Sequence, residues 1–155
     1  MSSLDFDTAY DSIVSRIAAL LPNHKRLRDP YNLEQNPDDF LKQGWGLSVG
    51  GGGLAGENTK RFTGCIVTTR IYYQLAITRK SYALDLDPAN KAITDKNLLE
   101  DARVIIEDVW KNNFNIEDSP LIEFRDFSGI SPVRVDKNSY LYVTMNLGAE
   151  YRINI

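Results

Sequence analysis

A nucleophile motif occurs once in the chain. Gly46-Leu47-Ser48-Val49-Gly50 matches G-x-S-x-G, the turn that presents a catalytic serine in many hydrolases. That turn works only when a helix follows the serine and a histidine is placed to accept its proton. Here glycines and then a strand pattern follow, and the single histidine, His24, precedes the motif. The match therefore does not predict a hydrolase.

A dinucleotide-binding pattern is also incomplete. Gly51-Gly52-Gly53-Leu54-Ala55-Gly56 satisfies G-x-G-x-x-G, which binds pyrophosphate when a helix begins directly after it and supplies free amide groups. A strand pattern follows instead, and Glu57-Asn58 stand where a phosphate-binding loop has Lys-Ser or Lys-Thr. We expect Gly50 to Lys60 to form the flexible tip of a hairpin, which becomes ordered only on assembly.

Acidic residues gather at three places without predicting a metal or acid–base site. Asp85, Asp87 and Asn90 suggest a calcium loop, but ordinary turn formation explains them. The pairs Glu100-Asp101 and Glu107-Asp108 fall on the polar side of a helical pattern, where we expect solvent around them. The sequence predicts no catalytic residue, no cofactor and no metal.

Composition places the chain among ordinary globular domains. Its 155 residues fit one domain, residues 1–155, and 43% of them are hydrophobic. Eighteen basic and 21 acidic side chains give a net charge of −3, which disfavours a dedicated nucleic-acid binder but suits a protein that DNA slides past. The lone Cys65 excludes an internal disulfide. Because no apolar run reaches the ~20 residues of a membrane span, and no signal peptide opens the chain, we expect a soluble protein made in the cytoplasm.

The strongest pattern in the sequence is a period-2 alternation from Thr63 to Lys80. Apart from Thr69, apolar residues occupy every second position from Cys65 to Ile77, and a similar alternation closes the chain from Tyr140 to Ile153. Strands usually have about 5–6 residues, so strands of this length exceed what the core of one small domain needs. Their surplus length predicts pairing or packing with another copy or another protein. The chain is therefore expected to be an assembly component.

Two helical patterns accompany the long strands. Apolar residues recur at spacings of three and four from Phe6 to Leu21, before Pro22, and again from about Asp95 to Asn112, with Thr94 as the expected N-cap. The expected apolar face of the second helix consists of Leu98, Leu99, Ala102, Ile105, Ile106 and Val109. Each helix therefore has one face to bury against a sheet.

Shorter strands complete the predicted fold. They are Gly44–Val49, Leu121–Phe127 and a bent continuation at Val133–Val135, while Gly148 predicts a bulge in the last strand and Asp29–Leu41 is a polar connection. We predict a single α+β domain in the order helix, hairpin, helix, hairpin. Its mostly antiparallel sheet has about four strands, both helices cover one face, and the long strands project.

The other face of the long strands is the expected contact surface. Tyr72, Tyr140 and Tyr142 lie opposite the core register, where aromatic residues pair across strands or enter protein interfaces. Arg70 and Arg79 are expected near the projecting end of the first long strand. The predicted partner interface comprises Gly51, Gly52, Gly53, Leu54, Arg70, Tyr72, Gln74, Arg79, Tyr140 and Tyr142.

This order of elements resembles the tail terminators of long-tailed bacteriophages. A first helix (Phe6–Leu21) leads to a hairpin with a long loop, and a second helix (Asp95–Asn112) leads to a closing hairpin. The alternating stretch Tyr140-Leu141-Tyr142-Val143-Thr144-Met145 close to the last residue is typical of such proteins. The resemblance covers nearly the whole chain but rests on architecture, and the family has no catalytic signature to carry over.

The resemblance implies a structural protein of the virion tail and neck, assembled in the host cytoplasm. It would form a homohexameric ring that caps the tail tube, stops its polymerisation and joins the tail to the head. The implied partners are further copies of the chain, the tail tube protein, a head-proximal connector or stopper protein, and a sheath protein where the tail has one. Genome DNA would pass through the ring without specific binding, and no membrane is involved.

Two other readings of the sequence stay open. One is another neck protein, such as a stopper or tail-completion protein. The second is a small-molecule-binding or regulatory α+β domain, with Gly50–Gly56 as a lid over a pocket. An enzyme is the third choice, because no convergent set of titratable residues is visible.

Overall fold

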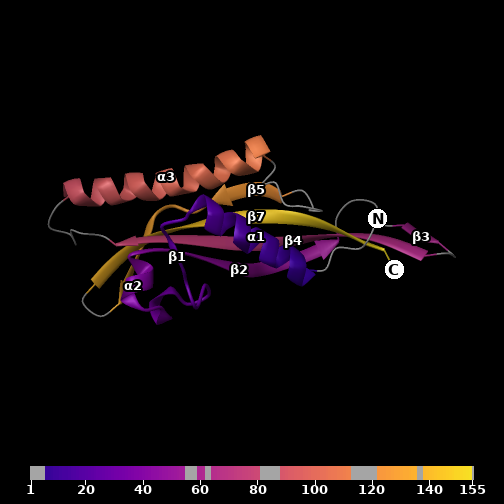
Figure 1. Cartoon of the computed structure of the whole chain (residues 1–155), viewed down its shortest axis with the longest axis horizontal. Helices are drawn as coiled ribbons and strands as arrows, with labels where there is room; N and C mark the ends of the chain where they lie inside the picture. Colours follow the sequence, from indigo (N-terminus) through magenta and orange to yellow (C-terminus); the bar gives the residue numbers. More distant parts are fainter. Residues whose placement is uncertain are drawn as a thin grey trace.

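Two strands of 17 residues run along the long axis of the molecule, as their alternating sequences predict (Figure 1). They are β4 (Gly64–Lys80) and β7 (Asn138–Asn154), paired antiparallel from Ile66 opposite Asn154 to Lys80 opposite Tyr140. The structure is a computed structural model that describes residues 6–54, 59–61, 64–80, 88–112, 122–135 and 138–154.

Further strands add to both sides of this pair, and the described part of the chain makes a sheet of seven strands where the sequence predicts about four. The strand order is β1-β2-β4-β7-β5, with β3 also paired to β4 and β6 also paired to β7. Every pair is antiparallel except β1 with β2. The added strands are β1 (Lys25–Arg26), β2 (Gln43–Leu54), β3 (Thr59–Arg61), β5 (Ile122–Phe127) and β6 (Ser131–Val135). The sequence underestimates the count because β4 and β7 are each long enough to pair with two short strands in succession.

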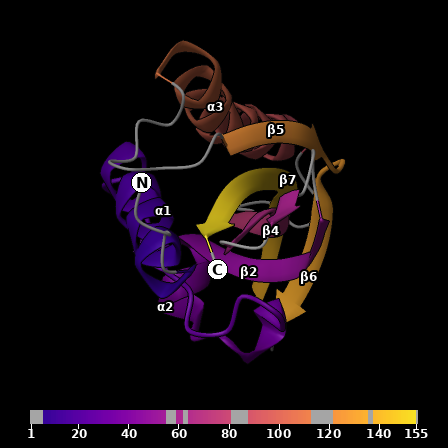
Figure 2. The same ribbon diagram turned by 90° about the vertical axis from the view of Figure 1, so that its right-hand side faces the viewer.

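Both long helices lie on one face of the sheet, which confirms the predicted α+β class. They are α1 (Phe6–Leu20) and α3 (Pro88–Asn112), and Figure 2 shows α3 above the curved sheet and α1 at its left. Their buried side chains meet the odd-numbered positions of β4 and β7, because successive strand residues alternate between faces. This main core consists of Ala9, Ile13, Ile17, Leu21, Trp45, Leu47, Tyr73, Leu75, Ile77, Leu98, Ala102, Ile105, Val109, Leu141, Val143, Met145, Leu147 and Ala149.

The segment after α1 covers part of the opposite face. It contains β1, the 3-10 turn η1 (Leu33–Gln35) and the one-turn helix α2 (Asp38–Leu41). Leu27, Leu41 and Tyr140 form a small second core there. The prediction of a polar connection was therefore incomplete, since this segment buries its own apolar residues against the sheet.

The glycine-rich stretch is strand, which corrects the prediction of a flexible tip from Gly50 onward. The strand β2 runs on to Leu54, pairing Gly51 with Tyr72 and Leu54 with Thr69 after a register shift between Val49 and Gly51. The backbone of Gly51 has φ +140°, which side-chain-bearing residues rarely adopt, so glycine accommodates the irregularity. Residues 55–58 of the predicted tip lie outside the described residues.

The predicted bulge at Gly148 is wrong. The strand β7 keeps an unbroken register with β4 through Gly148, which stands opposite Tyr72. The irregularities fall in the neighbouring strands instead, in β2 at Gly50 and in β5 between Phe124 and Asp126. A central strand paired on both sides holds its register, whereas an edge strand bends at lower cost.

The helix α3 begins at Pro88, earlier than the Thr94 cap that the sequence predicts. Proline suits the first helical position because it has no amide hydrogen to leave unpaired, and Thr94 is buried inside the helix. Leu99 is 47% exposed and does not belong to the predicted apolar face. Of the predicted Asp85–Asn90 turn cluster, residues 85–87 lie outside the described part, and residues 88–90 begin α3 instead of forming a turn.

We expect Ile105→Ala in α3 to lower the free energy of unfolding by about 2–5 kcal/mol, because Ile105 is fully buried between helix and sheet. Leu99→Ala on the exposed side of the same helix should change it by only about 0.5 kcal/mol. Chemical denaturation of the two variants measures this difference. Equal losses would contradict the assigned helix face.

Candidate assembly surfaces

The edge of β2 is shielded along its first half by groups from other elements. The Leu27 amide donates to the Trp45 carbonyl at 2.7 Å, and the Tyr10 hydroxyl donates to the Leu47 carbonyl at 2.9 Å. The Val49 amide donates to the Tyr31 hydroxyl at 3.2 Å. These bonds satisfy outward-facing backbone groups that an edge strand otherwise leaves open.

The second half of the same edge is bare within the described part of the chain. β1 pairs with β2 only at Gly44 and Trp45, and no described group bonds the outer side of Gly51–Leu54. Positions 50–53 are exposed, and a Cβ at Gly53 would meet nothing within 4 Å. Three predicted interface residues, Gly51 to Gly53, thus lie at an open sheet edge; the side chain of Leu54 is outside the description.

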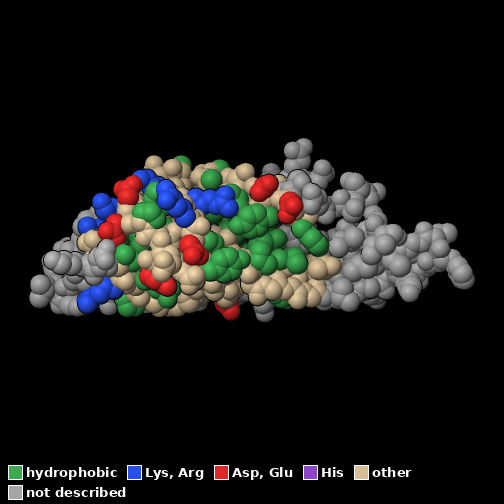
Figure 3. All heavy atoms as spheres, turned by 90° about the horizontal axis from the view of Figure 1, so that it is seen from below, with side chains coloured by type: hydrophobic (Ala, Val, Ile, Leu, Met, Phe, Trp, Pro, Cys, Tyr) green, Lys and Arg blue, Asp and Glu red, His purple; other side chains and the backbone are tan. Residues whose placement is uncertain are grey.

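Apolar and basic side chains lie along the part of β2 that precedes the bare segment. Val49 and Tyr31, whose hydroxyl bonds the Val49 amide, are 48% and 67% exposed. Beside them, Arg26 and Arg28 line a hollow of about 480 Å³, together with Tyr10, Leu27, Pro30, Tyr31 and Leu47. Figure 3 views the molecule from the side of α2 and β2 and shows hydrophobic side chains gathered there, with Lys and Arg side chains nearby.

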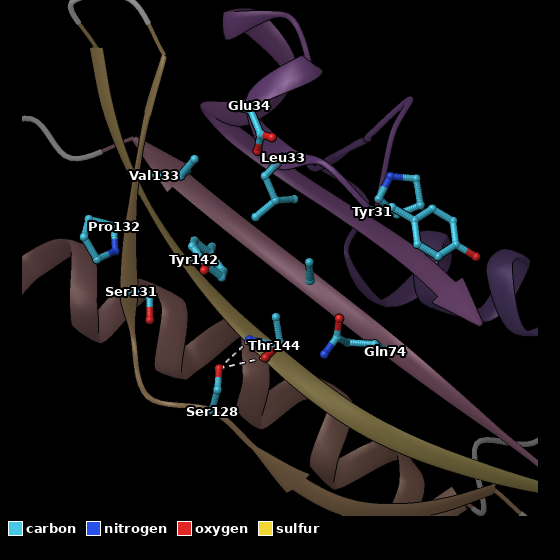
Figure 4. A pocket seen from close by; sticks show the side chains of 12 residues that line it. Tyr31, Leu33, Glu34, Gln74, Ser128, Ser131, Pro132, Val133, Tyr142 and Thr144 are labelled. Atoms are coloured by element: carbon cyan, nitrogen blue, oxygen red, sulfur yellow. Dashed lines mark hydrogen bonds between the residues drawn. The ribbon is translucent and has the colours of Figure 1, made fainter. Parts of the chain in front are cut away.

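A second hollow opens on the sheet face that the long helices leave free (Figure 4). It measures about 400 Å³ and lies between the η1 segment and β6. Its lining is formed by Pro30, Tyr31, Leu33, Glu34, Gln74, Ala76, Ser128, Ser131, Pro132, Val133, Tyr142 and Thr144. Two predicted interface residues, Gln74 and Tyr142, therefore lie in this groove.

The floor of the groove is polar but mostly neutral. The Ser128 hydroxyl accepts a hydrogen bond from the Thr144 amide at 3.1 Å and lies 2.8 Å from the Thr144 hydroxyl. Glu34 is the one charged residue in the lining. Such a groove can hold a polar or mixed ligand, but one carboxylate does not make an acid–base pair.

Tyr140 corrects the predicted interface, because its side chain is fully buried in the second core. Its hydroxyl donates to the Asp38 carboxylate at 2.8 Å, which ties β7 to α2. The sequence pattern placed Tyr140 on the right face, but the segment after α1 covers that end of the face. A residue that its own chain buries cannot contact a partner.

The two predicted interface arginines are engaged within the chain. Arg70 pairs with Glu150 across β4 and β7, at partly exposed positions. Arg79 forms a two-bond pair with Asp101 of α3, at 2.8 and 2.9 Å. Arg79 therefore joins the sheet to the helix, whereas Arg70 lies toward the projecting end. Tyr72 is half-buried opposite Gly148.

A buried polar cluster surrounds Asp101, which corrects the expectation that this carboxylate is solvated. His24 Nε2 lies 3.0 Å from the Asp101 carboxylate, and the Gln43 amide nitrogen lies 3.3 Å from His24 Nδ1. Burial raises the pKa of Asp101, but hydrogen bonds and charge from His24 and Arg79 outweigh burial and hold that pKa below its ordinary value.

Asp108, seven residues further along α3, is the second carboxylate that is buried although the sequence analysis expects it to be solvated. It is 4% exposed and accepts two hydrogen bonds from Arg16 of α1, at 3.0 and 2.5 Å. The pair raises the pKa of Arg16, chiefly through the hydrogen bond. The helical spacing in the sequence could have predicted this burial. Asp101 and Asp108 lie on the same side of the helix as Leu98 and Ile105, whereas Glu100 and Glu107 point to solvent and bond Arg103.

The hydrolase motif gains no support from the geometry. Ser48 lies within β2, with no helix after it, and its hydroxyl donates weakly to the Gln74 carbonyl at 3.4 Å. Among the described residues, no three His, Cys, Asp or Glu side chains are grouped to hold a metal ion. No helix in the described part combines the length and apolar character that crossing a bilayer requires.

Comparison with protein-family models and with curated proteins found no match to this chain.

We expect Asp101→Asn to lower the free energy of unfolding at neutral pH by roughly 3–5 kcal/mol, because it removes one partner of a largely buried ion pair. A depressed carboxylate pKa stabilises the fold above the ordinary pKa near 3.8, and this stabilisation is lost as the pH falls through the folded-state pKa. The difference between wild type and variant should therefore shrink on acidification from about pH 5. Urea denaturation across this pH range tests both points, with exposed Glu100→Gln as the control; a gap that does not depend on pH would contradict the cluster.

Proposed function

We propose that this chain is a structural virion protein that works like a phage tail terminator. Copies of it form a closed ring, which the family resemblance puts at six, on the last ring of the tail tube. The ring stops tube polymerisation and joins the tail to the head through a connector or stopper protein. It acts in the tail and neck of the virion and catalyses no reaction.

The observation that carries this proposal is the surplus length of the β4–β7 pair. The two strands match over the whole run from Ile66 to Lys80, while the helices cover only part of it. In Figure 1 the end of β4 that pairs with β3 extends beyond α1 and α3. A domain does not need strands beyond its core for its own stability, so the projecting end favours a contact outside the monomer.

The described side chains also favour a structural role over catalysis. Among the described residues, the two buried carboxylates Asp108 and Asp101 are paired with Arg16 and Arg79, which join α3 to α1 and to the sheet. Such pairs hold elements together, and neither lies in one of the two large hollows. Structural ion pairs perturb pKa values without chemistry.

One observation favours a second candidate, a small-molecule-binding or regulatory domain. The groove under η1 has hydroxyl and amide groups on its floor and apolar residues at its walls, an arrangement that suits a small polar ligand. Its lid would be the η1 segment, since Gly50–Gly53 belong to β2. A ligand that raises the melting temperature of the monomer, with no ring at any concentration, would favour this alternative.

The decisive experiment is an assembly reaction that lacks this protein. We expect tail tubes of irregular length, or tubes that fail to join heads, in electron micrographs, with normal joining restored by the purified chain. The variant Ser48→Ala should restore joining fully, because its hydroxyl makes one weak internal bond. His24→Ala is not a suitable control, because the side chain of His24 is buried against Asp101. Normal head-attached tails without the protein would refute the proposal.

A further inference from the structure

We propose that the exposed edge of β2 binds the β5 strand of a second copy of this chain, head to tail. The inference rests on the proposed ring and identifies the surface that closes it. Three features follow one another along this edge: two arginines without a described carboxylate partner beside Trp45 and Leu47, exposed apolar side chains at Tyr31 and Val49, and bare strand backbone at Gly51–Leu54.

Strand direction permits this contact without any rearrangement. β2 and β5 are the two ends of the long path β2-β4-β7-β5, in which each strand is antiparallel to the next. Across three antiparallel steps, β5 runs opposite to β2. A neighbour in the same orientation therefore brings its β5 antiparallel to β2, and the sheet continues from one copy to the next.

The registers align the β5 edge with part of the β2 edge along the strand direction. Ile122 of β5 stands in one row with Ala149, Ile71 and Gly52. Phe127 stands in one row with Met145, Leu75 and Leu47. A neighbour related by rotation without a rise thus presents β5 to the stretch Leu47–Gly52. A repeat without a rise closes into a ring, whereas a rise would produce a helix.

Each half of this stretch offers a different contact. Around Gly50–Gly52 the backbone is open, so the first residues of the partner's β5 can add ladder hydrogen bonds. Around Leu47 and Val49 the hydroxyls of Tyr10 and Tyr31 hold the backbone, so contact there is between side chains. The tyrosines thereby limit strand addition to a short segment.

Charge supports β5 as the occupant. The arginines Arg26 and Arg28 stack on Trp45 and Phe40, at 5.8 and 5.0 Å from the ring centres, and are exposed. The β5 sequence Ile-Glu-Phe-Arg-Asp-Phe supplies acidic residues at positions 123 and 126, with one arginine at the bulge. Asp126 is exposed, accepts a hydrogen bond from Asn146 and stands in the row of Ser48, three positions along β2 from the row of Trp45 and Arg26.

The same charges disfavour the symmetric alternative. In a two-fold dimer centred near Leu47 of β2, the Arg26 and Arg28 pairs of the two copies would face each other, and like charges across an interface repel. A head-to-tail contact instead brings Arg26 and Arg28 to an acidic strand. Opposite charges across an edge also select the partner and its register.

The test is a charge exchange between the two edges, read by sedimentation velocity over a range of concentrations. We expect Arg26→Glu with Arg28→Glu in one chain to weaken self-association by roughly tenfold or more. Glu123→Arg with Asp126→Arg in another chain should do the same. A mixture of the two variant chains should recover rings. In the mixture the acidic β2 edge of one variant meets the basic β5 of the other, and the unchanged β5 and β2 edges also meet each other. Arg134→Glu, exposed on β6, is the matched control and should change nothing.

The possible results distinguish a failure of the β2–β5 contact from a failure of the proposed function. If the charge variants form rings as well as wild type does, or if the mixture stays dissociated, the β2–β5 contact is wrong and the ring remains. A wild-type chain that stays monomeric at every concentration, with or without tail tubes, overturns the ring and this contact together. Circular dichroism of each variant verifies that the fold is intact.

Discussion

The antiparallel pairing of β4 with β7 is the interaction on which the rest of the structure depends. It extends without a register shift from Ile66 opposite Asn154 to Lys80 opposite Tyr140, so it assigns every residue of both strands to one of two faces. A slip of one residue would exchange the faces and bring Gln74 and Thr144 under the helices. The helix-side core, the free groove and the rows that connect β5 with β2 all follow from this one register.

Glycine determines how closely other elements approach the sheet beside this pair. A Cβ at Gly44 would lie 2.3 Å from the Phe40 carbonyl, and one at Gly46 would lie 2.9 Å from Pro30. The segment after α1 can therefore lie directly on the backbone of β2, where it buries Tyr140 and places Tyr31 beside Val49. The glycines that the sequence analysis assigns to a loose tip, Gly50–Gly53, form a later part of the same strand, and that part is bare at its edge.

Buried ion pairs add specificity to the helix side of the sheet. Arg16 with Asp108 joins α1 to α3, and Arg79 with Asp101 joins β4 to α3. A buried pair contributes little net free energy compared with apolar packing, but it strongly penalises arrangements that separate the partners. The two pairs thus restrict the rotation of α3 about its own axis. The apolar face of the helix alone would permit a wider range of rotation angles.

The sequence by itself determined the features that depend on local periodicity. The alternation in β4 and β7 and the helical spacing of Ile13, Ile17, Leu98 and Ile105 predicted the long strands, the two helices and their common face, because burial on one side imposes that spacing. Only the tertiary structure decided what depends on contacts distant in sequence: the burial of Asp101 beside His24, the enclosure of Tyr140, and the continuation of β2 through Gly53. A glycine run has no side-chain pattern of its own, and a carboxylate near the border of a helix face can be solvated or paired. The partner strand and the arginine that decide these cases lie far along the chain, so the fold has to form before they meet.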